Sequence, residues 1–377
     1  MSYPMRNRKE SKLSQLNWLI ILLVLGLGVL GITMLYSAAG GSWSPWAFNH
    51  AIRFGGGMAI MIIIALFPSR LLLDYAYLIY GGCLGLLVLV ELIGSVGMGA
   101  QRWLDLGFMT LQPSELMKLG LIVALARYYN GLLPEETERT TYHLPPIILT
   151  SVPVLLILLQ PNLGTAFIVA VIGAVMLFVT GLKLRWFMLV AVLLVATVPI
   201  GWTYVLHDYQ KQRVMTFLNP EADPLGTGYN IMQSKIAIGS GGLFGKGLGQ
   251  GSQSQLDFLP EKHTDFIFTM IAEELGFIGA GGVIFTFLLL IVLAIATGMR
   301  SRSTFGSLVA VGIATFLLLH IAINIAMVMG LVPVVGIPLP LLSYGGSVLL
   351  ATQIGIGLLL NAYVHRDTGL SRNRFLG

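Results

Sequence analysis

The feature that most constrains this chain is a series of apolar stretches, each long enough to cross a lipid bilayer as a helix. Trp18 to Leu35 and Gly282 to Gly298 contain no charged residue and can span roughly 30 Å of hydrocarbon. Charged residues make up only 10% of the chain, whereas a soluble domain carries about 25%. The sequence therefore predicts an all-α, polytopic integral membrane protein.

Hydropathy predicts about ten transmembrane helices within a single membrane domain covering residues 1–377. The fifth helix is expected to be short and bent by Pro145, Pro146 and Pro153. One large loop remains, at about residues 207–264. The predicted spans cover residues 17–37, 48–67, 72–94, 113–130, 145–160, 164–181, 186–206, 265–298, 305–330 and 341–363.

The distribution of basic residues predicts that both termini are cytoplasmic. The short loops on the opposite side hold only Arg53 and Arg102, which is the asymmetry that the positive-inside rule requires. The first apolar run exceeds the roughly 7–15 residues of a cleavable signal, so we expect an uncleaved span, with the large loop on the outer, periplasmic face. The predicted cytoplasmic basic residues are Arg6, Arg8, Lys9, Lys12, Arg70, Arg127, Arg139, Lys183, Arg185, Arg300, Arg302, Arg366, Arg372 and Arg374.

An acidic residue stands where the large loop runs into the eighth predicted span. We expect Asp265 to begin that helix, where the positive end of the helix dipole favours a carboxylate, and to act as a general base. The alternative is a plain helix-start residue, capped by Thr264 or by itself. Glu273 is eight residues on, or about 12 Å deeper, which is too far for two carboxylates to act on one glycosidic bond. Asp265 alone is therefore the expected base.

A second group of charges opens the fourth predicted span. Pro113 suits the first helical position, and Glu115 and Lys118, three residues apart, share one face. They form either an ion pair that neutralises both charges for packing or a pocket in which Lys118 meets an anionic head group. In the preceding loop, Arg102 adds a cation and Trp103 is typical of an interfacial anchor.

Other patterns exclude several functions. The run Gly242 to Gly247 lacks two defining residues of a phosphate-binding loop, because Ser240 replaces its first glycine and Gly247 its Ser/Thr, so nucleotide hydrolysis is excluded. Cys83 is the single cysteine, and there is no Cys/His cluster for zinc or haem. The net charge of +5 belongs to the membrane topology and is no sign of nucleic-acid binding.

Two softer signals concern helices. Residues 229–238 have the apolar periodicity of a short interfacial helix. His320 and Asn324 share a face of the ninth span, where either is a candidate for an interhelical hydrogen bond.

Taken together, one base and several cations are expected at the outer leaflet, beside apolar helices able to hold an isoprenoid tail. This combination suits a lipid-linked anionic substrate such as a polyprenyl diphosphate sugar. The cations are Arg102, Lys118, Arg213, Lys246 and Lys262.

Several motifs, spread over nearly the whole chain, resemble the SEDS family (shape, elongation, division, sporulation), and its elongation branch more than its division branch. Asp265 matches the family's essential outer-loop aspartate, and Glu115 and Lys118 match its charged pair. Asn162 stands where the family carries Asp, so we assign that position no catalytic role. The matching motifs are Gln101–Leu104, Gln112–Glu115, Gln160–Pro161, Leu259–Phe268, Ala272–Gly276 and Leu342–Ser347.

The resemblance implies a ten-helix peptidoglycan glycosyltransferase that polymerises lipid II at the outer face of the bacterial inner membrane during cell elongation. Its implied partner is a class B penicillin-binding protein, whose transpeptidase crosslinks the new strand. Asp265 would activate the acceptor 4-hydroxyl while polyprenyl diphosphate leaves. The expected substrate-binding residues are Glu115, Lys118, Arg102, Lys246, Lys262 and His263.

A divalent cation (Mg or Mn) is expected to assist the leaving group, although no motif identifies its ligands, and no organic cofactor is expected. Two alternatives remain open. A lipid II flippase would depend on Glu115 and Lys118 more than on Asp265. A non-enzymatic scaffold that activates the penicillin-binding protein would tolerate the loss of every buried charge.

Overall fold

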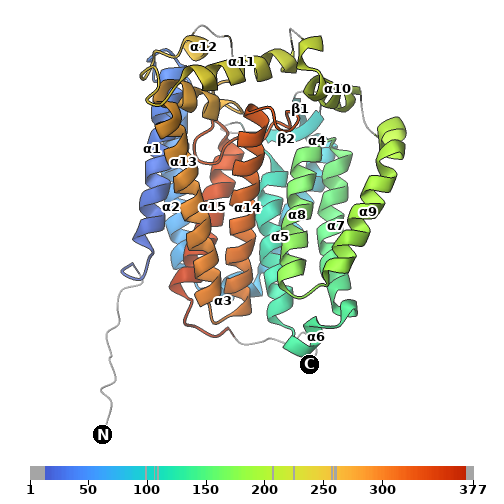
Figure 1. Cartoon of the computed structure of the whole chain (residues 1–377). Coiled ribbons are helices and arrows are strands. Elements are labelled where there is room, and N and C mark those ends of the chain that lie inside the picture. The colour runs from blue at the N-terminus through green and yellow to red at the C-terminus, as the bar shows by residue number, and fades with distance from the viewer. Residues whose placement is uncertain are drawn as a thin grey trace.

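The computed structural model is a bundle of long, roughly parallel and antiparallel helices (Figure 1). It describes residues 13–97, 100–105, 107, 110–205, 208–223, 226–255, 258 and 261–370. The basic stretch from Arg6 to Lys12, residues 256, 257, 259 and 260 of the large loop, and Arg372 and Arg374 lie outside the described residues.

Each of the ten predicted spans corresponds to a helix or to a pair of consecutive helices, so the prediction of a polytopic helical membrane protein is confirmed. The third span is the pair α3 and α4, and Pro153 lies inside the fifth, α7. The elements are α1 (Trp18–Ala38), α2 (Trp46–Leu66), α3 (Ser69–Asp74), α4 (Ala76–Ile93), α5 (Pro113–Asn130), α7 (Leu144–Leu159), α8 (Leu163–Val179), α9 (Leu184–Ile200), α13 (Ile267–Arg300), α14 (Thr304–Val328) and α15 (Gly346–Val364).

Length and composition qualify seven helices in the described part of the chain as membrane spans. These are α1, α2, α4, α7 with its preceding turn, α13, α14 and α15. The helices α8 and α9 are apolar but shorter. The remaining helix, α5, carries Glu115, Lys118 and Arg127, which lowers its hydropathy although nearly all of its residues are buried.

The two faces of the bundle differ in what they carry. Three helices of the large loop cover one face, here called the loop face (Figure 1). The start of α1 and the end of α15 lie at the opposite, terminal face, together with α6 (Pro134–Thr137) and the turn Thr140–His143. The loop-face helices are α10 (Asp208–Leu218), α11 (Thr227–Ser240) and α12 (Ser252–Gln255). The α11 helix confirms the helix expected from the periodicity of residues 229–238.

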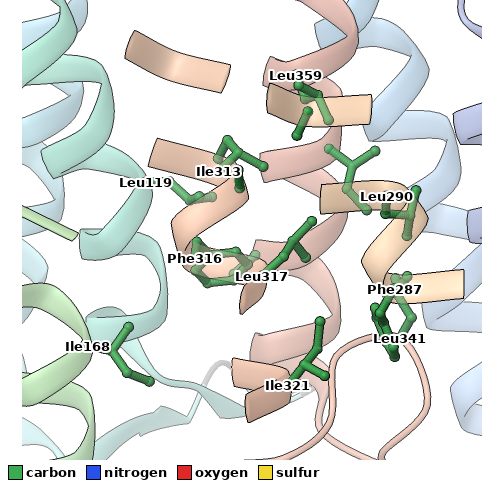
Figure 2. Packing of buried hydrophobic residues seen from close by; sticks show 14 of the residues in the cluster. Leu119, Ile168, Phe287, Leu290, Ile313, Phe316, Leu317, Ile321, Leu341 and Leu359 are labelled. Carbon is green, nitrogen blue, oxygen red and sulfur yellow. The ribbon is translucent and has the colours of Figure 1, made fainter. Parts of the chain in front are cut away.

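The core lies between α5, α8, α13, α14 and α15. Figure 2 shows Leu119, Phe316, Leu317 and Leu359 among the side chains that fill the space between these helices. The polar residues described below lie toward the loop-face end of this core.

A small antiparallel sheet on the loop face was not predicted from the sequence. Its strands are β1 (Ser95–Gly97), β2 (Ala100–Asp105) and β3 (Thr110–Leu111), in that order. It forms between α4 and α5, where Gln101 donates a hydrogen bond from Nε2 to the Gly94 carbonyl, 2.7 Å away. The sheet therefore gives a fixed course to the chain that enters α5.

Candidate active site

Asp265 lies in a tight turn and not at the start of a helix. The Glu261 carbonyl accepts hydrogen bonds from the N–H groups of Thr264 (3.1 Å) and Phe266 (3.2 Å). The Thr264 hydroxyl donates to the Glu261 carboxylate at 2.5 Å. Because α13 begins only at Ile267, the prediction that Asp265 begins the helix is wrong by two residues. The turn holds the backbone of Asp265 in place from the loop side.

A side chain from α14 holds the same turn from the core side. Asn324 donates from Nδ2 to the Asp265 carbonyl at 2.8 Å and to the Ile337 carbonyl at 2.7 Å. Gly336, next to Ile337, has a φ of +80°, and a Cβ there would lie 3.4 Å from Asp265 Oδ2. The loop between α14 and α15 therefore packs directly against the carboxyl group.

The surroundings of Asp265 suit proton transfer near neutral pH. The pKa of Asp265 is raised to about 7, mainly by burial and also by the negative charge of Glu261, while the guanidinium of Arg213 lowers it in part. Arg213 is itself fixed by a hydrogen bond from Nη1 to the Val335 carbonyl, at 3.3 Å. A base whose pKa lies close to the working pH is the most effective kind of general base.

An aromatic stack lies beside this turn. The His263 ring stacks on Trp46, with centroids 4.3 Å apart and planes at 10°, and Tyr344 donates from its N–H to the His263 carbonyl at 2.8 Å. The Arg53 guanidinium lies 5.3 Å from the centre of the Tyr344 ring. Burial lowers the pKa of His263, which favours its neutral form. The neighbouring Lys262 is buried.

The charged pair of α5 is an ion pair in the core. Lys118 Nζ lies 2.7 Å from the Glu115 carboxylate, and both side chains are almost fully buried. His320 on α14 completes the group, with Nε2 2.8 Å from Lys118 Nζ and Nδ1 2.9 Å from the Phe316 carbonyl. Because Nδ1 must donate to that carbonyl, Nε2 accepts from the ammonium group, which fixes the neutral tautomer.

Two residues of α14 connect this buried group with Asp265. His320 and Asn324 are one helical turn apart, a rise of about 6 Å along the axis. The first contacts Lys118 and the second contacts the Asp265 carbonyl. The expected interhelical contact is thus confirmed for His320, whereas Asn324 bonds a turn and a loop instead of a helix. The two predicted charge centres belong to one polar column between α5, α14 and the start of α13.

Two predicted substrate-binding residues have protein partners elsewhere. Arg102 donates from Nε to the Gln160 carbonyl at 3.1 Å and from Nη2 to the Pro161 carbonyl, so it fastens the sheet to the turn between α7 and α8. Lys246 pairs with Glu273 at 2.8 Å. Asn162, to which we assigned no catalytic role, caps α8 by accepting from the Thr165 N–H.

Sequence reasoning missed the contribution of α2 to the site. Trp46, His50 and Arg53 follow one another at spacings of four and three residues, which places them on one helix face. His50 is buried, with Nε2 3.2 Å from the Leu341 carbonyl. This polar face within an apolar span is the signal in the sequence that indicates the contribution of α2, whereas the distribution of basic residues assigns Arg53 only to a loop.

Among the described residues there is no cluster of three or more His, Cys, Asp or Glu side chains arranged to hold a metal ion. Magnesium is often held by one or two carboxylates together with phosphate oxygens of the substrate. Glu261, whose charge acts on Asp265, is the acid next to the proposed base that fits that pattern.

Comparison with known proteins places the chain among relatives along almost its entire length. Residues 15–368 match the FtsW, RodA and SpoVE family, described as "Cell cycle protein". The peptidoglycan glycosyltransferase MrdB of Escherichia coli K12 is 43% identical over 348 residues, which cover 92% of this chain and 93% of MrdB.

Solved structures agree with that match. A chain from work titled "Structural coordination of polymerization and crosslinking by a peptidoglycan synthase complex" is 35% identical, with a TM-score of 0.78, covering 93% of this chain and 98% of its own. The rod shape determining protein RodA of Thermus thermophilus is 31% identical, with a TM-score of 0.70, covering 94% and 98%.

Proposed function

We infer that this chain, which belongs to the FtsW, RodA and SpoVE family, is a peptidoglycan glycosyltransferase. The observation that carries the chemical part of this conclusion is Asp265, a half-buried carboxyl group whose pKa is raised to about 7. It lies at the loop-face end of the polar column, beside Arg213 and the aromatic stack of Trp46 and His263. Such a carboxyl group can accept a proton from a sugar hydroxyl at neutral pH.

The loop face is proposed to be the outer face of the bacterial inner membrane, and both termini to be cytoplasmic. Among the short connections between helices, those of the terminal face carry more basic residues than those of the loop face, as the positive-inside rule requires of the cytoplasmic side. They include Arg70, Arg139, Lys183, Arg185, Arg300 and Arg302. In this orientation Asp265 meets the head group of a lipid-linked sugar in the outer leaflet.

The proposed reaction is glycosyl transfer between two lipid II molecules, or between lipid II and a growing strand. Asp265 takes the proton from the 4-hydroxyl of the acceptor N-acetylglucosamine. The oxygen then forms a bond to the anomeric carbon of the donor N-acetylmuramic acid and inverts it from α to β. The bond from that carbon to the diphosphate oxygen breaks, and polyprenyl diphosphate leaves with the electron pair. Asp265 afterwards returns its proton to solvent.

The leaving diphosphate needs positive charge around it. Arg53, Arg213 and Lys262 lie around the turn that carries Asp265 and are proposed to supply that charge. A divalent cation held by Glu261 together with the diphosphate oxygens would neutralise further charge as the bond breaks. Lys118 already contacts Glu115 and His320, so its proposed part is to support the floor of the site.

The proposed partner is a class B penicillin-binding protein. Support comes from the solved peptidoglycan synthase complex, whose description couples polymerization with crosslinking and whose chain this one resembles. The partner's transpeptidase would crosslink the strands made at Asp265.

Polymerisation of labelled lipid II tests the proposal. The purified chain is incubated with substrate, a divalent cation and a penicillin-binding protein blocked by penicillin, and products are separated on a gel. We expect a glycan ladder from the wild type and none from a folded Asp265→Ala variant. A ladder of wild-type intensity from Asp265→Ala contradicts the assignment of the base. Movement of lipid II across vesicles without any ladder indicates a flippase, and no activity in either assay indicates a scaffold.

A further inference from the structure

The transmembrane helix that follows Asp265 is broken at a glycine. Gly276 has φ +67° and ψ −165°, which interrupts α13 nine residues after its start. In an unbroken helix, Phe277 and Ile278 would donate their N–H groups to carbonyls one turn earlier. Here they donate to the carbonyls of Gly242 (2.9 Å) and Leu243 (3.1 Å), which belong to the large loop.

The carbonyls freed by the break are satisfied by the same loop. The Glu273 carbonyl accepts from the Lys246 N–H, and the Glu274 carbonyl accepts from the Gly247 N–H, both at 3.0 Å. The two hydrogen bonds lost from the helix are thus replaced by four to the loop. We call the segment Gly242–Gly247, seated in the break of α13, the loop clamp. It explains the run that failed as a phosphate-binding motif.

The clamp needs glycine where the two backbones meet. Gly245 has a φ of +80°, and a Cβ on it would lie 2.1 Å from the Glu274 carbonyl oxygen. A Cβ on Gly276 would lie 2.3 Å from the Gly245 nitrogen. Any side chain at either position would push the loop out of the helix.

An ion pair between Lys246 and the buried Glu273 holds the loop clamp against α13. Lys246 Nζ lies 2.8 Å from Glu273 Oε1 and 2.7 Å from the Ser252 hydroxyl, and Gln253 donates its N–H to the same Glu273 oxygen at 2.9 Å. The Glu273 side chain is completely buried, whereas that of Lys246 is 26% exposed. Lys246 therefore brings a positive charge to a fully buried carboxylate, and removing one partner of such an ion pair is costly.

The neighbouring acid ties the same turn of α13 to α1. The Glu274 carboxylate accepts from the Ser37 hydroxyl at 2.8 and 2.7 Å, and Gln255 donates from Nε2 to the Ser37 carbonyl at 2.9 Å. The end of α13 nearest Asp265 is therefore anchored to the large loop and to α1 at the same level. Figure 1 shows α11 and α12 lying over this end of the bundle.

We propose that Lys246 is a positioning residue for the transfer reaction: its pairing with Glu273 seats the loop clamp and thereby fixes the segment of α13 that leads from Asp265. The inference rests on the proposed role of Asp265 as the base. Glu273 lies six residues, or about 9 Å, along α13 from Ile267, which is two residues after Asp265. A shift of the clamped turn reaches Asp265 through a short, rigid stretch of helix, and a displacement of about 1 Å at a reacting group can cost about 10²-fold in rate.

This role differs from the substrate-binding role predicted from the sequence, and the two predict opposite results for a paired substitution. Lys246→Met removes the ammonium group that contacts the Glu273 carboxylate, so we expect kcat to fall by about 10²-fold with the KM for lipid II unchanged. Adding Glu273→Gln removes the negative charge that Lys246 balances, and we expect kcat to return to within about tenfold of the wild type. A lysine that binds diphosphate would give a raised KM that Glu273→Gln does not restore.

The experiment measures kcat and KM for labelled lipid II in the purified complex, for the wild type, Lys246→Met, Lys246→Met with Glu273→Gln, and Lys211→Met. Lys211, on α10 of the same loop, has no ion pair or hydrogen bond among the described contacts and serves as the matched control. Wild-type activity in Lys246→Met, or equal loss in the single and double variants, overturns the proposal. If Lys246→Met does not fold, the double variant decides alone, and its loss of activity contradicts the proposal.

The same experiment separates this inference from the function on which it rests. An active wild type and an inactive Asp265→Ala variant support the glycosyltransferase whatever the Lys246 variants do. A wild type without polymerisation contradicts the proposed function and, with it, the positioning role.

Discussion

At the scale of single residues, the environment of Asp265 carries the most chemical meaning. A surface aspartate has a pKa near 3.8, and burial raises that of Asp265 to about 7, with a contribution from Glu261. As a result, a fraction of the Asp265 carboxyl groups is protonated at neutral pH. The carboxylate is also a stronger base than that of a surface aspartate, which favours proton transfer from the sugar hydroxyl.

A pH profile of the polymerisation rate tests this directly. The base acts only when deprotonated, so kcat should be constant above a pH of about 7 and fall about tenfold per unit below it. Glu261→Gln removes a neighbouring negative charge and should move the acid limb to lower pH. A wild-type rate that stays constant down to about pH 5 would mean that Asp265 is not the titrating base.

A paired substitution tests whether the buried ion pair of Glu115 and Lys118 serves only packing or also the reaction. Glu115→Gln alone leaves the Lys118 ammonium group without its counter-charge and should destabilise the fold by about 3–5 kcal/mol. Replacing both, with Glu115→Gln and Lys118→Met, should restore thermal stability because no unpaired charge remains. We expect polymerisation to stay low in the double variant, since His320 then loses the donor that holds it. Recovery of both stability and activity would show that the pair serves packing alone.

At the scale of elements, the break in α13 links loop and bundle. Gly276→Ala places a Cβ against the Gly245 nitrogen at a positive φ, so it should lower the free energy of unfolding by more than about 1 kcal/mol. Gly281→Ala, on the same helix, meets no atom within 4 Å and should be neutral or stabilising by up to about 1 kcal/mol. Thermal unfolding in detergent compares the two variants. Equal stability of the two would contradict the loop clamp.

The elements also show what the sequence could and could not predict. The spans were predicted within a few residues because hydropathy is a local property of each segment. The ion pair of Lys246 with Glu273 was not predicted. It joins the large loop to α13 near the break at Gly276, and this geometry depends on glycine backbone angles. The sheet β1–β3 was missed because its strands are short and have no clear alternation of apolar residues.

At the scale of the whole molecule, the sequence predicted individual groups of the candidate site but not how the fold brings these groups together. Asp265, His263 and Lys262 were found as neighbours in one motif, and Glu115 with Lys118 as a pair. That α14 joins the two groups through His320 and Asn324 follows only from helix packing. The contribution of Arg53 from α2 depends on the same packing, which brings α2 beside the loop before α15.

The bundle as a whole places one base at the loop-face end of a polar column, and apolar side chains such as Leu119, Ile313 and Phe316 pack together in the core beside that column (Figure 2). Such an arrangement suits chemistry at one membrane surface more than passage through the membrane. A transporter needs a site that opens to both faces in turn.

The most direct test of the account is the release of polyprenyl diphosphate from lipid II by the purified complex, measured together with the number of new glycosidic bonds. The account predicts one diphosphate released per bond by the wild type, and neither product from a folded Asp265→Ala variant. Bonds formed at the wild-type rate by Asp265→Ala, or a folded wild-type complex that releases no diphosphate, would contradict it.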